Sequence, residues 1–259
     1  DSSNTSTRDT DVDVETLTVT AVRLGSSEGS GTAGTVGSAL TGTYGQLTLN
    51  SNGSYTYVAN QTAADNLDAG DVATDSFNYT VSDGTDTDTA VITITVIGIN
   101  DAPSAQNDVG VIVEDGTLTV TNGSNATLTG DSYDATGENS GDLIDTSSSS
   151  HTDSDLDTSA SLSITQIKKD GGSNSAVASG SSYNSSGTQV TGTYGTLTIG
   201  ADGSYTYAAT ADAADPLDVG ESDTDVFVYT LSDGTATTTA TLTITTVSYT
   251  HLTLPTSRS

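Results

Sequence analysis

The chain has 259 residues, enough for about two domains of ordinary size. Five Lys and Arg residues against 34 Asp and Glu give a formal net charge of -29, which disfavours nucleic acids and anionic membrane surfaces as partners. There is no Cys, which excludes disulfides, thiolate metal sites and Cys nucleophiles, and no apolar run approaches the roughly 20 residues that span a bilayer.

Alternating apolar and polar residues predict a series of short β-strands in the first part of the chain, at 17–22, 47–49, 55–57, 77–81 and 92–96. Asn52-Gly53 and Asp83-Gly84 lie between them and supply the positive φ angles that tight hairpins need. Thr occupies many of the outward positions. The pattern therefore predicts antiparallel strands, each with one buried face.

The second part of the chain repeats the first. Gly-Thr-Tyr-Gly at 42–45 recurs at 192–195, Asn/Asp-Gly-Ser-Tyr-Thr-Tyr at 52–57 recurs at 202–207, and the same constant offset carries 74–84 onto 224–234. Upstream, 17–22 aligns with 162–167, so only the connecting loop differs in length. Two similar units of about seven short strands each predict an all-β protein with two tandem antiparallel β-sandwich domains.

The repeat also sets the expected boundaries. We expect a first domain at 1–98, truncated at its N-terminus, a linker at 99–104, and a second domain at 105–247. The second domain is expected to carry a flexible Ser/Asp/Gly-rich loop at about 131–157, and 248–259 is interpreted as a non-native tail. Residues 109–120 predict a first strand that the first domain lacks, which would leave that domain with an open sheet edge.

With these motifs, the units resemble the VCBS family of bacterial repeats, which are cadherin-like (Ig-like) sandwiches of very large RTX-like adhesins. The resemblance is carried by Gly-Thr-Tyr-Gly, Asn/Asp-Gly-Ser-Tyr-Thr-Tyr, Leu-Asp-x-Gly, Phe-x-Tyr-Thr-x-Ser-Asp-Gly and the linker Asn-Asp-Ala-Pro at 100–103. It implies a secreted or cell-surface protein, often exported by type I secretion from a Gram-negative bacterium. It also implies roles in adhesion or biofilm matrix.

A further likeness, to the calcium sites of cadherins, implies calcium as a cofactor at the domain junctions. Its expected ligands are Asp71, Asn100, Asp101, Glu114, Asp153 and Asp155. Calcium takes six to eight oxygen ligands, and no single short loop here supplies that many, whereas a junction fed by both domains could. The alternative interpretation is that these carboxylates serve turns and solubility.

Two other acidic groups stand out. Asp9, Asp11 and Asp13 form an Asp-x-Asp series at the entrance to the first domain. Asp83, Asp86 and Asp88 lie in a hairpin, where turn chemistry is favoured over a separate ion site. The recurring Asp75 and Asp225 are interpreted as caps or turn residues.

We expect no enzyme activity. The two His residues, His151 and His251, lie in a Ser-rich loop and in the doubtful tail, so no Ser-His-Asp arrangement is supported. The repeated Tyr residues at 44, 55, 57 and 79 favour packing roles over a sugar-binding stripe. The sequence therefore favours an extracellular spacer or adhesion segment whose partners are neighbouring repeats, with surface glycans or proteins as further candidates and no nucleic acid or membrane insertion. The alternative is a carbohydrate- or protein-binding module, including an accessory to an absent catalytic domain.

Overall fold

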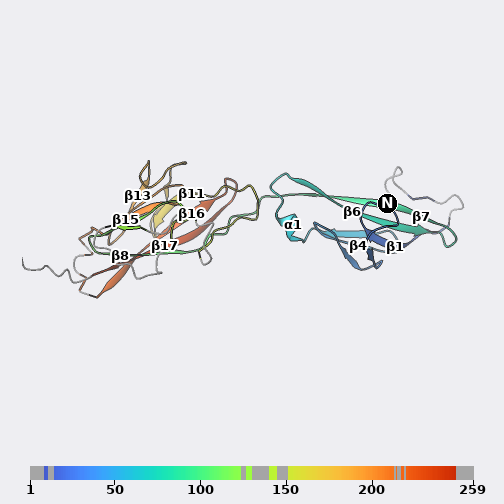
Figure 1. Cartoon of the computed structure of the whole chain (residues 1–259), viewed down its shortest axis with the longest axis horizontal. Coiled ribbons are helices and arrows are strands. Elements are labelled where there is room, and N and C mark those ends of the chain that lie inside the picture. The colour runs from blue at the N-terminus through green and yellow to red at the C-terminus, as the bar shows by residue number, and fades with distance from the viewer. Residues whose placement is uncertain are drawn as a thin grey trace, which may run out of the picture. The chain divides into compact units, whose positions relative to one another are not determined.

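Figure 1 shows the computed structural model, which describes residues 9–10, 15–123, 127–129, 140–144, 151–212, 214, 217–218 and 220–248. The chain divides into two compact units. The first unit comprises 1–101 with 157–159, and the second comprises 102–156 with 160–259. Both are tandem β-sandwiches built almost entirely of strands, which confirms the predicted all-β class. In the described residues the only helix is the short α1 (Thr62–Asp65).

The first unit packs two antiparallel sheets. One has the order β2-β1-β6-β7 and the other has the order β3-β4-β5. Their bounds are β1 (Thr18–Leu24), β2 (Ala33–Gly34), β3 (Ala39–Thr41), β4 (Gln46–Leu49), β5 (Tyr55–Val58), β6 (Val72–Ser82) and β7 (Thr87–Ile97). The inward faces form a core of Val19, Val22, Leu40, Leu47, Leu49 and Phe77. The predicted alternation is therefore confirmed on β4, where Leu47 and Leu49 are the buried residues.

The second unit has the same plan with more strands. Its sheets have the orders β12-β11-β16-β17-β8 and β10-β9-β15-β14-β13. The bounds are β8 (Asp108–Val113), β9 (Thr117–Val120), β10 (Thr127–Thr129), β11 (Ser163–Lys169), β12 (Ser175–Ala176), β13 (Thr188–Thr191), β14 (Thr196–Ile199), β15 (Tyr205–Ala208), β16 (Ser222–Ser232) and β17 (Thr237–Val247). The larger core includes Leu197, Tyr205, Tyr207, Phe227 and Tyr229.

The segment 109–120, predicted as one strand, is two strands in different sheets. β8 pairs with β17 in parallel, and Figure 1 shows the two running side by side. β9 pairs with β15 in the opposite sheet. The chain changes sheets at Asp115, which has a φ of 62°, and at Gly116, where a Cβ atom would lie 2.9 Å from the Val113 carbonyl oxygen. The alternating pattern alone did not reveal this turn.

Part of the loop predicted as flexible packs against the second unit. Ser140 and Leu143 are buried. The Ser140 N–H donates to the Val109 carbonyl, and the Leu143 N–H donates to the Gly203 carbonyl, both at 3.0 Å. The flexible interpretation is therefore wrong for 140–144, while 131–139 and 145–150 lie outside the described residues. So do Asp11, Asp13, His251 and 249–259.

A buried carboxylate joins the two sheets of the first unit. Asp75 on β6 accepts hydrogen bonds from the backbone N–H groups of Thr43 (2.9 Å), Tyr44 (3.0 Å) and Gly45 (3.2 Å). It also accepts one from the Tyr57 hydroxyl at 2.6 Å. Because a buried charge is costly unless it is well hydrogen-bonded, this one residue fixes the 42–45 turn against β6.

The second unit repeats this arrangement. Asp225 on β16 accepts hydrogen bonds from the N–H groups of Thr193 (2.6 Å) and Tyr194 (2.9 Å) and from the Tyr207 hydroxyl (2.6 Å). Lys169 adds an ion pair at 3.4 Å. Two repeated motifs, Gly-Thr-Tyr-Gly and Asn/Asp-Gly-Ser-Tyr-Thr-Tyr, therefore supply the groups that surround the buried carboxylate in each unit.

The first glycine of each Gly-Thr-Tyr-Gly turn is required by that carboxylate. A Cβ atom on Gly42 would overlap the Asp75 carboxylate, and one on Gly192 would overlap that of Asp225. Any side chain here would push the turn away from the buried acid. The first glycine of the motif thus allows the backbone of the turn to lie directly against the buried carboxylate.

Candidate functional site

The predicted calcium ligands of the first unit lie in the turns at its C-terminal end. Asp71 is exposed, and its carbonyl accepts from the Gly98 N–H at 2.9 Å. The Asn100 side-chain amide donates to the Asp101 carbonyl. The Asp101 N–H donates to the Asp157 carboxylate at 2.9 Å. The Asp101 backbone therefore contacts Asp157, an acidic residue that was not among the predicted ligands.

The structure does not bring the predicted ligands of the second unit together. Asp153 is buried, and its carboxylate accepts from the Gln106 N–H at 2.8 Å, just before β8 begins. Glu114 lies just after β8 ends, where its carboxylate accepts from the Ser248 hydroxyl at 2.7 Å. The six-residue β8 lies between them and spans about 20 Å. Glu114 and Asp153 cannot share one ion within this unit.

Asp155 instead lies near a second carboxylate of its own unit. Asp155 and Asp233 each offer an oxygen, and these two atoms lie within 4.8 Å of each other. Both residues are half-buried. Sequence reasoning missed Asp233. Asp157, which continues the Asp153-x-Asp155 spacing by one further step, belongs to the first unit.

Asp233 reaches this position from the hairpin between β16 and β17. One of its carboxylate oxygens accepts hydrogen bonds from the N–H groups of Thr235 and Ala236. In the first unit the corresponding Asp83 accepts from the N–H groups of Thr85 and Asp86 in the same way. The predicted turn chemistry of this hairpin is therefore confirmed, and the turn fixes the position of each carboxylate.

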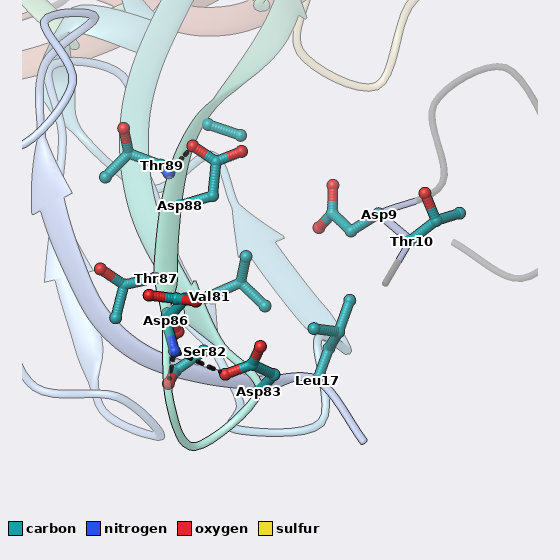
Figure 2. A pocket seen from close by; sticks show the side chains of 11 residues that line it. Asp9, Thr10, Leu17, Val81, Ser82, Asp83, Asp86, Thr87, Asp88 and Thr89 are labelled. Carbon is teal, nitrogen blue, oxygen red and sulfur yellow. Dashed lines mark hydrogen bonds between the residues drawn. The ribbon is translucent and has the colours of Figure 1, made fainter. Parts of the chain in front are cut away.

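The first unit has an acidic pocket at the same hairpin. Figure 2 shows the pocket, which has a volume of about 330 Å³ and includes the β6–β7 hairpin and Leu17 in its lining. Four carboxylates contribute to it: Asp9, Asp83, Asp86 and Asp88. Asp9 comes from the N-terminal segment and accepts a hydrogen bond from the Tyr79 hydroxyl at 2.8 Å. Burial and this bond raise the pKa of Tyr79 to about 12.

The chemistry of these donors suits a hard cation. The Asp155–Asp233 pair and the pocket offer carboxylate oxygens and no His or Cys ligand among the described residues. The four carboxylates of the pocket carry eight oxygen atoms, and calcium takes six to eight oxygen ligands. Soft or borderline metals prefer nitrogen and sulfur donors. The residues present therefore fit calcium better than zinc or copper.

A second buried acid lies beside the Asp153 segment. The Tyr229 hydroxyl donates to Asp108 at 2.7 Å and to the Gln106 carbonyl at 2.9 Å. Burial raises the pKa of Asp108 to about 7, and the charge of Asp153 acts in the same direction. His151 contacts the Asn107 carbonyl at 2.7 Å through Nδ1. These contacts bind the 151–155 segment to the start of β8.

Most of the repeated tyrosines pack inside the units. Tyr57 donates to Asp75, and its ring packs edge-on against Phe77 with the ring centres 6.4 Å apart. In the second unit Tyr205, Tyr207 and Tyr229 are completely buried. The predicted packing role is confirmed for Tyr57 and is wrong for Tyr55, which is 53% exposed.

Residues 1–98 match the family model of the bacterial cadherin-like domain. A comparison with curated proteins gave no match. This family match covers the first unit, and for that unit it indicates a cadherin-like fold of the kind found in extracellular, adhesion-type repeat modules. No helix in the described part of the chain is long and apolar enough to cross a membrane.

Several solved structures are similar at low identity. The endo-fucoidan hydrolase MfFcnA4 from glycoside hydrolase family 107 is 20% identical, with a TM-score of 0.25 over 92% of this chain and 24% of that one. Mouse PcdhgC3 EC1-3 is 10% identical, with a TM-score of 0.33 over 90% of this chain and 56% of that one. The protocadherin GammaB4 extracellular domain is 13% identical, with a TM-score of 0.37 over 82% and 27%. The chain thus spans about a quarter of the fucoidan hydrolase.

Proposed function

We propose that this chain is a non-enzymatic spacer or adhesion segment of a large surface or secreted adhesin from a Gram-negative bacterium, and that calcium stiffens it. The observation that carries the calcium part is the four-carboxylate pocket of the first unit, formed by Asp9, Asp83, Asp86 and Asp88. The bacterial cadherin-like family match supports the adhesion part. Type I secretion and a role in biofilm matrix belong to the same proposal and rest on the sequence motifs.

Electrostatics supports a cation partner. The formal net charge of -29 is balanced by only five Lys and Arg residues. Carboxylates held within a few ångströms of one another repel when all are ionised, so an ion that they share relieves this repulsion. A divalent cation bound by oxygen ligands would therefore stabilise the folded chain at neutral pH.

We propose that the Asp155–Asp233 pair of the second unit is the counterpart of the acidic pocket of the first unit. Asp83 corresponds to Asp233 in the repeat, and the two make the same turn. Asp9 begins an Asp-x-Asp-x-Asp series like that of Asp153, Asp155 and Asp157. Each unit would then bind calcium at its own β6–β7 or β16–β17 hairpin.

The partners we propose are neighbouring repeats of the same protein, with surface glycans or proteins as further candidates. The high acidity argues against nucleic acid and anionic membranes. A spacer needs a stiff, polar repeat and no catalytic group. This requirement agrees with the strand-rich units and with their threonine-rich outward faces.

Calorimetry with calcium on the full chain tests the proposal. We expect binding with a dissociation constant of roughly 10⁻⁴–10⁻³ M, as in other extracellular modules. The double variant Asp155→Asn/Asp233→Asn should weaken binding at the site of the second unit at least tenfold. Asp83→Asn/Asp86→Asn should weaken binding at the other site.

The matched control is Asp65→Asn, which removes one exposed carboxylate of α1 and should leave binding unchanged. Circular dichroism in chelator establishes that each variant is folded. An absence of calcium heat in the wild-type chain, or equal heat in all variants, would contradict the calcium part and leave these residues as turn and solubility groups.

A further inference from the structure

The core of the second unit contains a hydroxyl without a hydrogen-bond partner among the described residues. Tyr205 lies on β15 and is 0% exposed, and its hydroxyl makes no hydrogen bond in the described part of the chain. The other two completely buried tyrosines of this core, Tyr207 and Tyr229, donate to Asp225 and Asp108. Because an unsatisfied buried hydroxyl is costly, this exception points to a partner that the protein side chains do not supply.

Two buried carboxylates lie close to the Tyr205 hydroxyl. Asp108, the first residue of β8, is 2% exposed, and Asp142 is 5% exposed. Burial raises the pKa of the Tyr205 hydroxyl, and the charges of Asp108 and Asp142 raise it further. Both carboxylates therefore act on the same hydroxyl inside the sandwich.

The segment 140–144 brings these groups together. It carries Asp142, and its backbone donates hydrogen bonds to β8, which begins with Asp108, and to the turn just before β15, which begins with Tyr205. β8 and β15 belong to different sheets. The Asp142 carboxylate accepts a hydrogen bond from the Gly123 N–H at 3.0 Å, which fixes its position. All of these residues belong to the second unit.

The charge of this region favours a cation. Asp153 is a further buried carboxylate, and its charge raises the pKa of Asp108. The charge of His151 acts in the opposite direction, and Lys169 pairs with Asp225. Buried carboxylates are tolerated when they are paired or when they coordinate a metal ion. Carboxylate and hydroxyl oxygens are donors that suit a hard cation such as calcium.

We propose that the second unit binds a hard divalent cation inside the sandwich, held by Asp108, Asp142 and the Tyr205 hydroxyl. The two carboxylates supply the charge, and the ion gives the buried hydroxyl oxygen its partner. Water molecules complete the coordination. This site is independent of the one proposed at the β16–β17 hairpin, because the two share no residue.

Calorimetry with calcium tests this site in a full chain that combines the two double variants of the hairpin sites described above. We expect one calcium ion to bind to this combined variant. Adding Asp142→Asn should weaken that binding by at least about tenfold, because the affinity follows the number of charged ligands. Circular dichroism in chelator establishes that each variant is folded.

Tyr205→Phe distinguishes a cation from a bound water molecule. In chelator, this substitution in the combined variant should not lower the free energy of unfolding, because it removes a buried hydroxyl that has no partner there. In calcium it should lower the free energy of unfolding, because the ion that stabilises the fold binds less tightly. Equal destabilisation in chelator and in calcium would show that the hydroxyl binds only water, and it would overturn the proposal.

Asp202→Asn is the matched control. Asp202 lies in the turn before β15 and accepts a hydrogen bond from the Ser204 N–H at 3.1 Å. Asn52 makes the same bond, to Ser54, at the equivalent position of the first unit, so Asn fits this turn. Asp202→Asn should therefore leave calcium binding unchanged. An absence of calcium binding in the combined variant, or equal binding with and without Asp142→Asn, would overturn this inference. Neither result would contradict the hairpin sites, which the separate double variants test.

Discussion

Replacing Asp225 with Ala is expected to lower the free energy of unfolding of the second unit by about 3–5 kcal/mol, because several buried donors lose their acceptor at roughly 1–3 kcal/mol each. The carboxylate is buried and accepts bonds from Tyr207 and from the N–H groups of Thr193 and Tyr194. Its loss leaves these donors and the Lys169 ammonium without their acceptor. Urea denaturation measures the change, and hydrogen exchange of β14–β16 assigns it to the second unit.

The same carboxylate makes the fold sensitive to acid. Burial alone would raise the pKa of Asp225, but the hydrogen bonds from Tyr207 and from the backbone hold it below its usual value of 3.8. Because the folded pKa is lower than the unfolded one, the stabilisation is present above pH 3.8 and is lost as the pH falls through the folded pKa. Asp225→Ala should therefore remove part of the stability loss that the wild-type chain shows in acid.

Asp75→Ala is the matched test in the first unit, and Asp170→Ala is the control because Asp170 is exposed in a turn. We expect Asp75→Ala to be strongly destabilising and Asp170→Ala to change stability by less than about 1 kcal/mol. If Asp225→Ala cost no more than Asp170→Ala, the buried carboxylates would not be what joins the two sheets.

Asp108→Asn is expected to remove a pH dependence of the free energy of unfolding that is opposite in sign to that of Asp225. Its size is up to about 4 kcal/mol. Burial raises the pKa of Asp108 to about 7, and the charge of Asp153 adds to this. Hydrogen bonds from Tyr229 and Ser140 and the charge of His151 act against it. The folded chain therefore keeps a proton between about pH 4 and 7 that the unfolded chain has lost, so stability falls as the pH rises through this window.

Urea denaturation at pH 5 and pH 8, in the presence of a chelator, measures this effect. The wild-type second unit should be less stable at pH 8 than at pH 5, and Asp108→Asn should reduce the difference. Asp115→Asn is the control, because Asp115 is exposed and lies in the next turn of the same segment. Equal pH profiles for the wild-type chain and Asp108→Asn would show that Asp108 is ionised in the folded protein at little cost.

The fold was largely predictable because its information is local. The alternation of Leu47 with Leu49 and the turns at Asn52-Gly53 and Asp83-Gly84 each depend on a few neighbouring residues. Repetition of the same motifs then gave two units. The change of sheet at Asp115 and Gly116 was missed because the alternating apolar residues continue on both sides of it.

The buried carboxylates were misinterpreted as caps or turn residues. Asp75 precedes Phe77 by two positions in the same alternating series, which places it on the inward face of β6. That spacing was the available signal for a buried role. The backbone N–H groups that bind these carboxylates lie about 30 residues earlier in the chain. These partners could be identified only from the packed structure.

The candidate site was predictable only in part. Asp155 was found because the Asp-x-Asp spacing is local. Asp233 lies beside Asp155 only through the position of the β16–β17 hairpin, which no short motif reveals. Glu114 was included because it follows an apolar run, but the length of β8 separates it from Asp153.

Small-angle X-ray scattering of the full chain, in calcium and in chelator, is the most direct test of a calcium-stiffened spacer. We predict a larger radius of gyration and a narrower distribution of conformations in millimolar calcium. The Asp155→Asn/Asp233→Asn variant should give the chelator profile under both conditions. Superimposable profiles of the wild-type chain with and without calcium would contradict stiffening by calcium, even if calorimetry showed that the ion binds.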